Sequence, residues 1–446
     1  KEYRRQRQMC IRDRFIGLLL CNSNSNAQQV DYIEYDLENG MHVILHQDNT
    51  APVVTTSVMY HVGAKDENPE RTGFAHFFEH LLFEGTVNIP KGEWFTIVTS
   101  NGGSNNANTT DDRTYYYEVF PSNNVELGIW MESERLLHPV INQEGVDTQN
   151  EVVKEEKRLR VDNSPYGKFL ENVKLHMFKK HPYKGTTIGK MEHLDAATLE
   201  EFQAFNKKYY VPNNATLVIA GDIDVPSVKK MIEDYFGPIP RGEDIVRDFP
   251  KEDPITEPIR AKAYDANIQI PAIMAAYRTS SFKDRDSYVL DMISTYLSDG
   301  KTSKLYKKLV DDKKIALQAG AINFSQEDYG LYILFGLPLG DTSLDTLVVE
   351  MDEEIEKLKS ELISERDYQK IQNKFENDFV SSNSSVEGIA NSLARYHMLY
   401  GDTNLINNQI DIYRSIKREE IKAVANKYLN ANQRLLLEYL PEPAQE

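Results

Sequence analysis

Cysteine is almost absent from the chain: the two cysteines, Cys10 and Cys21, both lie close to the N-terminus. The body of the chain therefore has no thiol that could act as a nucleophile, form a disulfide framework or bind a metal ion. This scarcity excludes the cysteine proteases and the cysteine-ligated zinc fingers. Any metal site in the body must be built from other side chains.

Basic residues are also in the minority, since 51 Lys and Arg stand against 69 Asp and Glu, which gives a formal net charge of −18. Binding to a nucleic acid backbone needs clustered Lys and Arg, so we expect no nucleic acid partner. The body of the chain has no apolar run of the roughly 18 residues that a membrane span requires. We therefore expect no integral membrane span in the mature chain.

The N-terminal segment has features of an export signal. A short apolar run at residues 15–20 follows several arginines and precedes small residues at 25–27 that suit a cleavage site. We interpret residues 1–27 as a leader, in which residues 1–13 fit poorly and are taken as foreign to the native protein. A leader of this kind predicts a secreted or periplasmic protein. The alternative is an Arg-rich mitochondrial presequence and a location in the mitochondrial matrix.

The length of 446 residues predicts at least two domains, because domains usually comprise about 100–200 residues. Strand and helix patterns over residues 28–245 predict an N-terminal domain that carries the catalytic residues. Residues 246–271 contain four prolines among many charges and indicate a linker. A second set of strand and helix patterns predicts a C-terminal domain at residues 272–446.

Local patterns predict strands where β-branched and aromatic residues alternate, and helices where apolar residues recur at intervals of three and four. Asn39-Gly40, between two alternating runs, predicts a hairpin within residues 32–46. The other expected strands are 53–62, 114–120, 215–220, 272–277 and 331–335. The expected helices are 71–85, 126–138, 145–160, 199–210, 286–297, 345–361 and 365–380.

The two halves of the chain contain an internal repeat. A pattern of helix, turn and apolar strand that begins at Leu199 recurs at Arg418, with a constant offset of 219 residues. Because the repeat unit is as large as a domain, a solenoid of short repeats is not indicated. The sequence predicts an α+β protein of two homologous α/β-sandwich domains, related by duplication. Each domain is expected to contain a mixed, mainly antiparallel sheet with helices packed on it.

The motif that carries the clearest chemistry is His76-Phe77-Phe78-Glu79-His80. On a helix, His76 and His80 lie one turn apart on the same face, which Glu79 shares. Two neutral imidazoles suit Zn²⁺, and a glutamate between them can act as general base on a bound water. The alternative is a surface helix with two chance histidines, but the surrounding Phe and Leu residues favour a helix anchored in a core.

A catalytic zinc site needs a third protein ligand, and Glu156 is a candidate. Val152, Val153 and Leu159 surround it at helical spacing, so Glu156 interrupts an apolar stripe. A carboxylate in such a position must be paired or bind a metal ion. From the residues alone, a metal ligand and a salt bridge to Arg160 one turn later are both open.

With these residues in place, the chain resembles the pitrilysin/insulinase (M16) family of zinc metallopeptidases. The His-x-x-Glu-His order and the spacing of 76 residues from His80 to Glu156 both match that family. The resemblance covers about residues 30–440 and is similar in layout to the short, two-domain members, such as the catalytic subunit of the mitochondrial processing peptidase and its bacterial homologues. The matching segments are residues 73–86, 151–158, 163–167 and 212–222.

The resemblance implies that His76, His80 and Glu156 bind one Zn²⁺ per chain and that Glu79 is the catalytic base. It also implies that residues 102–109 contain a substrate-binding strand, in which Asn106, Ala107, Asn108 and Thr109 contact a peptide. From composition alone, this Gly- and Asn-rich run predicts a loop. Gln149 occupies a position where some relatives have an acid that supports the metal ligands.

The implied function is a zinc-dependent endopeptidase that hydrolyses peptides or unfolded polypeptide segments. The alternative is a non-catalytic structural or peptide-binding subunit of the same fold. Relatives use an Arg and a Tyr from another domain to hold the scissile carbonyl, whereas the second half offers Tyr332 and no clear Arg. We therefore expect a homodimer, or a heterodimer in which a metal-free homologous subunit supplies these groups.

Overall fold

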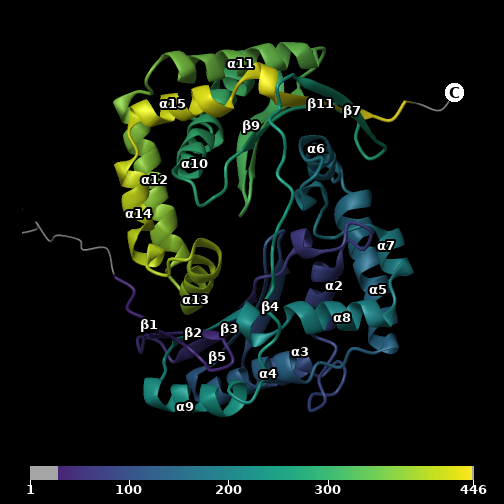
Figure 1. Cartoon of the computed structure of the whole chain (residues 1–446). Helices are drawn as coiled ribbons and strands as arrows, with labels where there is room; N and C mark the ends of the chain where they lie inside the picture. Colours follow the sequence, from purple (N-terminus) through teal and green to yellow (C-terminus); the bar gives the residue numbers. More distant parts are fainter. Residues whose placement is uncertain (1–28, 444–446) are drawn as a thin grey trace, which may run out of the picture. The chain divides into compact units, whose positions relative to one another are not determined.

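The computed structural model describes residues 29–443, so the expected leader at 1–27 and both cysteines lie outside the described residues. The described chain forms two β-sheets, each covered by helices (Figure 1). This architecture confirms the fold class that the sequence predicts. Within residues 29–443, no helix combines the length and the apolar character needed to cross a membrane.

The first sheet has the strand order β1-β2-β6-β3-β5-β4. Neighbouring strands are antiparallel except for β2 and β6, which are parallel. The order makes β1 and β4 the two edge strands. The strands are β1 (Ile33–Asp36), β2 (His42–Gln47), β3 (Val53–Tyr60), β4 (Ser104–Thr109), β5 (Thr114–Pro121) and β6 (Ala215–Gly221).

The second sheet has the order β7-β11-β8-β10-β9, in which only β7 and β11 pair in parallel. Its strands are β7 (Ile259–Asp265), β8 (Ala272–Thr279), β9 (Ala316–Ser325), β10 (Gly330–Pro338) and β11 (Arg434–Pro441). Residues 246–271, which we interpret from the sequence as a linker, thus include the edge strand β7. The division into domains at residues 245 and 271 stays a prediction.

Helices cover both sheets and are joined by short 3₁₀ and π-helical turns. In the first half they are α2 (Phe74–Leu81), α3 (Trp94–Ser100), α4 (Val125–Leu137), α5 (Gln143–Lys157), α6 (Phe169–Met177), α7 (Met191–Ala196), α8 (Leu199–Tyr209) and α9 (Val225–Phe236). In the second half they are α10 (Arg285–Ser298), α11 (Leu344–Ser360), α12 (Glu365–Ser382), α13 (Val386–Arg395), α14 (Leu405–Ser415) and α15 (Arg418–Tyr428). The short turns are η1 (Ala64–Asp66), η2 (Ser122–Asn124), η3 (Arg158–Asp162), η4 (Pro182–Lys184), η5 (Pro212–Asn214), η6 (Tyr306–Asp312), η7 (Tyr396–Tyr400) and η8 (Ala431–Gln433).

The expected duplication is visible in matching elements. Helix α8, turn η5 and strand β6 recur as α15, η8 and β11, and each begins at the predicted offset. In both copies a glutamate on the first turn of the helix accepts the amide N–H of the preceding cap residue, at 2.9 Å in each case. The copies also pair alike, since β6 and β11 each lie between one parallel and one antiparallel neighbour.

Each half contributes a helix to the other half's sheet. Helix α6, from the first half, packs against β8 and β11, where Val173 and Met177 join the second sheet's core. Helix α13, from the second half, packs against β3 and β6 of the first sheet, beside which it is drawn in Figure 1. The two halves are therefore joined by exchanged helices as well as by the connecting chain.

A buried cation also links the halves. Lys65, in η1, is only 2% exposed and pairs with Asp112 at 3.0 Å, Glu327 at 2.6 Å and Asp328 at 3.2 Å. Burial alone would lower the pKa of Lys65, but the carboxylates of Asp112 and Glu327 outweigh it and raise the pKa. The turn between β4 and β5 is thereby tied to the turn between β9 and β10.

Replacing Lys65 by methionine is expected to destabilise the chain by about 3–5 kcal/mol, because three carboxylates would lose their buried counter-charge. The control is Lys283→Met, since Lys283 also pairs with Glu327, at 3.0 Å, but its side chain is 46% exposed. Such an exposed pair contributes less than about 1 kcal/mol. Urea denaturation followed by circular dichroism measures both variants. Equal midpoints for the two would contradict the assignment of Lys65 as the link.

Candidate metal centre

His76, His80 and Glu156 converge on one point from two helices. The two histidines lie on α2, and Glu156 lies near the end of α5, which packs against α2. The Nε2 atoms of His76 and His80 are 3.5 Å and 3.1 Å from Oε2 of Glu156. One ligand atom from each residue lies within 4.8 Å of the others, a spacing that one small metal ion can bridge.

Helix α2 is anchored by its apolar face. Phe74, Phe77, Phe78 and Leu81 are buried in the first core, as the sequence predicts, which leaves the His-bearing face directed outward. The helix is shorter than the expected 71–85, because it starts after Gly73, whose φ of 97° is left-handed. The backbone direction thus changes directly before the metal helix begins.

Both ends of α2 are held by buried groups. At its start, the carboxylate of Glu67 accepts the amide N–H of Gly73 at 2.7 Å and of Ala75 at 2.8 Å. After its end, Arg135 donates to the carbonyl oxygen of Leu82 at 2.9 Å. Burial raises the pKa of Glu67 well above its usual range, so its hold on the helix start rests on these two hydrogen bonds. The cation at the C-terminal end also complements the helix dipole.

Arg135 is itself fully buried and paired. It donates to Glu132 at 3.0 Å and to Glu118 at 3.1 Å, and its guanidinium lies 3.9 Å from the ring centroid of Trp94. Burial alone would lower the pKa of Arg135, but the two carboxylates raise it. The charge that fixes the end of α2 is therefore permanent.

Glu156 uses its two oxygens differently. Oε2 faces the histidines, while Oε1 pairs with Arg160 at 2.8 Å. The salt bridge to Arg160, one of the two alternatives that the sequence left open, is therefore present, and Oε2 is placed where it could also bind a metal ion. The hydrogen bond from His80 lowers the pKa of Glu156 against the effect of burial, and the nearby His76 adds to the lowering.

The apolar stripe that we expected around Glu156 is only partly buried. Val153 is fully buried, but Val152 is 44% exposed and Leu159 is 63% exposed. The helix ends at Lys157 and continues as the π-helical turn η3, so residues after Glu156 no longer follow α-helical spacing. Glu156 is shielded by facing α2 and not by its helical neighbours.

The donor set fits a zinc ion. Burial, and then the neighbouring His80, lower the pKa of His76 to about 4, so its imidazole is neutral at physiological pH and keeps a lone pair for a metal. Two imidazole nitrogens and one carboxylate oxygen are a common ligand set for catalytic zinc. One feature is less typical: Nδ1 of His76 is buried and, among the described residues, has no hydrogen-bond partner.

Glu79 stands beside the cluster and is held by Thr109. The hydroxyl of Thr109 donates to Oε2 of Glu79 at 2.6 Å. Burial raises the pKa of Glu79, although this hydrogen bond and the charge of His80 oppose the effect. A carboxylate with a raised pKa and a fixed orientation is suited to accept and then release a proton.

A cavity of about 660 Å³ opens over these groups. Edge strand β4 forms one wall, where the expected substrate residues Asn106, Ala107, Asn108 and Thr109 all line it. The amide N–H of Ala107 donates to the side-chain oxygen of Asn106 at 2.9 Å. The segment is a strand, as the family resemblance implies, and not the loop that its composition predicts.

Two other expected residues lie away from the cavity. Gln149, on α5, donates to Glu84 at 2.5 Å, and no direct contact with a cluster residue is found for it among the described residues. Tyr332 is fully buried in the second core, so its side chain does not face a substrate. Neither side chain therefore lines the cavity over the candidate metal centre.

Arg113 is a residue that the sequence analysis missed. It donates to the backbone carbonyl of Asn108 at 3.1 Å, and its charge lowers the pKa of Glu79. Burial, followed by the charge of Arg395, lowers the pKa of Arg113 itself to about 10. No local pattern marks this residue, because its role depends on the hairpin that folds it back over β4.

Comparison with known families matches both halves of the chain. Residues 42–190 match the family described as "Insulinase (Peptidase family M16)", and residues 196–375 match the domain described as "Peptidase M16 inactive domain". His76, Glu79, His80 and Glu156 all lie within the first of these two ranges. The candidate centre thus belongs to the half that is not described as inactive.

Individual relatives match over nearly the whole chain. The chain is 28% identical to the zinc protease PqqE of Helicobacter pylori, over 89% of this chain and 90% of the relative. It is 23% identical to the "Probable mitochondrial-processing peptidase subunit beta, mitochondrial" of Arabidopsis thaliana, over 88% of this chain and 75% of the relative. The crystal structure of a protease from Helicobacter pylori superposes with a TM-score of 0.87 at 27% identity, over 93% of this chain and 100% of the other.

Proposed function

We propose that this chain, which belongs to the insulinase family of peptidases, family M16, is a zinc-dependent endopeptidase for peptides or unfolded polypeptide segments. The observation that carries the proposal is the convergence of His76, His80 and Glu156 at the mouth of a cavity walled by an edge strand. The names of relatives such as the zinc protease PqqE support the same chemistry.

In this proposal His76, His80 and Glu156 would hold one zinc ion. When bound, zinc lowers the pKa of water and polarises the scissile carbonyl. The chain's own residues supply orientation: Glu156 is held on its far oxygen by Arg160, and α2 is fixed at both ends. The neutral state of His76 favours metal binding over protonation.

Glu79 is proposed to take the proton from the attacking water and to pass it to the leaving amine. Burial raises the pKa of Glu79, which makes the carboxylate a better proton acceptor than an exposed glutamate. Thr109 keeps Oε2 in place, so the other oxygen, Oε1, is the one we assign to the water.

The substrate is proposed to lie along β4 as an added antiparallel or parallel strand. An edge strand offers unpaired backbone groups to an extended peptide, and β4 has its open side at the cavity. Ala107 offers its amide N–H once the side chain of Asn106 gives way. Backbone recognition of this kind favours unfolded segments over folded proteins.

The central test is a set of three variants at neighbouring glutamates. Glu79→Gln is expected to keep one zinc at this centre and to lose about 10²–10⁴-fold in kcat, because general base catalysis is worth that much. Glu156→Gln is expected to lose both the zinc at this centre and the activity. Glu155→Gln is the control, since Glu155 is exposed and pairs with Arg158. Zinc content and cleavage of a quenched fluorescent peptide measure all three.

The outcomes separate the proposal from its alternative. If Glu79→Gln cleaves peptides as fast as the unchanged chain, the assigned base is wrong. If the unchanged chain binds zinc and peptide without cleaving, it is a non-catalytic, peptide-binding subunit of the same fold. Loss of zinc in Glu155→Gln would show that the cluster is not the metal centre.

Peptide docking on β4 predicts slower hydrogen exchange of its backbone amides. In zinc-loaded Glu79→Gln, a saturating peptide is expected to protect the amides of residues 104–109, including Ala107. The amides of β1, the other edge strand of the same sheet, serve as the internal control and should be unchanged. Equal exchange of β4 with and without peptide would contradict docking on this strand.

We further propose that a second subunit completes the transition-state site. Tyr332 is buried, and the relatives' Arg has no clear counterpart in the second half. In a heterodimer, a metal-free homologue would supply donors for the oxyanion, whereas in a homodimer the second copy would have to supply donors other than Tyr332. Purification from the native source, with mass analysis, is expected to show such a partner. Full activity of the isolated chain as a monomer would contradict this part of the proposal.

Export to the periplasm is proposed from the leader-like residues 15–27, with the mitochondrial matrix as the alternative. Fractionation of the source cells distinguishes the two locations.

A further inference from the structure

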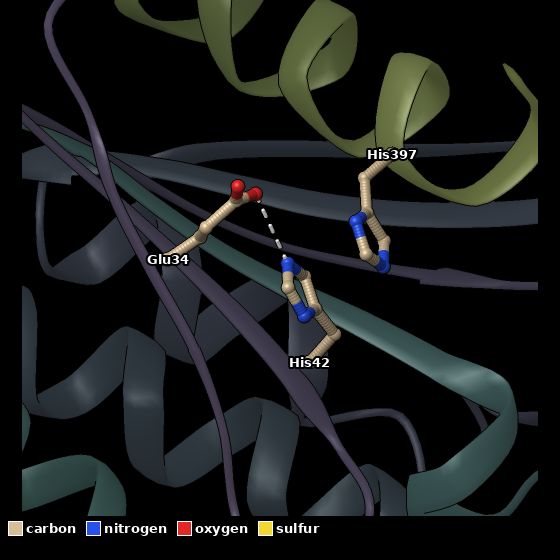
Figure 2. A group of neighbouring side chains, drawn as sticks. All are labelled: Glu34, His42 and His397. Atoms are coloured by element: carbon tan, nitrogen blue, oxygen red, sulfur yellow. Dashed lines mark hydrogen bonds and ion pairs between the residues drawn. The ribbon is translucent and has the colours of Figure 1, made fainter. Parts of the chain in front are cut away.

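A second group of metal-binding side chains lies at the opposite edge of the first sheet. Glu34 on β1, His42 on β2 and His397 in η7 each place one ligand atom within 4.8 Å of the others. Figure 2 shows Glu34 and His42 on adjacent strands, with His397 reaching toward them from the helical segment above. The first candidate centre borders β4, whereas this group borders β1, at the other end of the strand order.

The hairpin places the carboxylates and His42 on one face. In the β1–β2 register, Asp36 lies opposite His42, and Glu34 is two residues from Asp36, so the three side chains project to the same side. Nδ1 of His42 lies 2.7 Å from Asp36, and its Nε2 lies 3.3 Å from Glu34. If Nδ1–H donates to Asp36, Nε2 presents a lone pair toward the carboxylate of Glu34.

This arrangement resembles the surroundings of a bound metal ion. A ligating histidine usually donates its other ring N–H to a carboxylate, which fixes the tautomer and strengthens the ligand. Asp36 is positioned for that role. A lone pair and a carboxylate facing each other repel unless a proton or a metal cation lies between them.

His397 brings the other half of the chain to the same point. Its ring stacks on that of His42 with centroids 3.4 Å apart and an interplanar angle of 2°. Thr403 adds a hydrogen bond of 2.6 Å to Glu34, which orients that carboxylate.

The stacked rings set one condition on metal binding. The lone pair of an imidazole nitrogen lies in the plane of its ring, and the planes of His42 and His397 are parallel, with centroids 3.4 Å apart. Both rings can therefore reach one ion at about 2.0–2.1 Å only when one of them turns out of the stack.

We propose that Glu34, His42 and His397 form a second metal site, which binds a divalent first-row transition ion such as Zn²⁺ and staples the β1–β2 hairpin to the η7 segment. Two imidazoles and one carboxylate suit Zn²⁺ and its neighbours and are a poor match for Mg²⁺ or Ca²⁺, which take oxygen ligands. The role is structural, because the ion joins the first sheet to a segment of the second half.

The test uses a full-length chain in which His76 and His80 are both replaced by alanine, so that the first centre cannot contribute. After treatment with a chelator and dialysis, this chain is expected to bind one equivalent of Zn²⁺ in calorimetric titration. Bound Zn²⁺ is also expected to raise its Tm, since the ion binds the folded state. A folded chain that binds no zinc would overturn the proposal.

Adding His397→Ala to this background is expected to weaken zinc binding at least about 100-fold, because loss of an outer hydrogen-bond partner alone costs about 10–100-fold. The matched control adds His138→Ala instead, since His138 is partly exposed and lies in neither cluster. The control should keep one equivalent. Equal zinc affinity in the His397 and His138 variants would overturn the proposal.

Asp36→Asn is a second test of the site, chosen because this substitution is not expected to unfold the chain. Asp36 is 72% exposed on an edge strand, so its replacement should leave the fold intact, as circular dichroism checks. We expect zinc affinity about 10–100-fold weaker than in the background chain. Unchanged affinity would show that His42 is not a ligand supported by Asp36 and would overturn the assigned site.

Discussion

The position of helix α2 depends on two buried side chains, Glu67 and Arg135, which hydrogen-bond to the backbone at its two ends. A helix of 8 residues is too short to be stable by itself, so its place must be imposed from outside. Glu67 satisfies amide groups at its start, and Arg135 satisfies a carbonyl after its end. Buried charges are costly unless fully paired, and Arg135 is paired by two carboxylates and covered by aromatic rings.

This arrangement places the fixed helix α2 beside β4, an edge strand of the first sheet. Helix α2 contacts β4 and β5, so the histidines lie next to a strand that has a neighbour on one side only. Thr109 is the direct link, because it belongs to β4 and holds Glu79 on α2. The proposed base and the proposed substrate strand are therefore positioned by the same hydrogen bond.

The parts of the centre that depend on local spacing could be predicted from the sequence. His76, Glu79 and His80 share a helical face, and the buried Phe residues beside them follow from the same period. Glu156 was harder, because its shielding comes from α2 and its neighbours Val152 and Leu159 are exposed. Contacts between distant segments leave no periodic signal, so neither the Lys65 link nor the meeting of His42 with His397 could be derived from spacing.

The exchange of α6 and α13 between the halves has a consequence for how the duplicated chain can evolve. The first core is built from residues 37–239 and the second from residues 273–436, so each copy encodes a core of its own. The third core depends on both copies, because Val173 and Met177 of α6 cover apolar side chains of the second sheet. A gene fragment for the second half alone would leave that face of its sheet uncovered and prone to aggregation, so this half would need a new covering segment to exist independently.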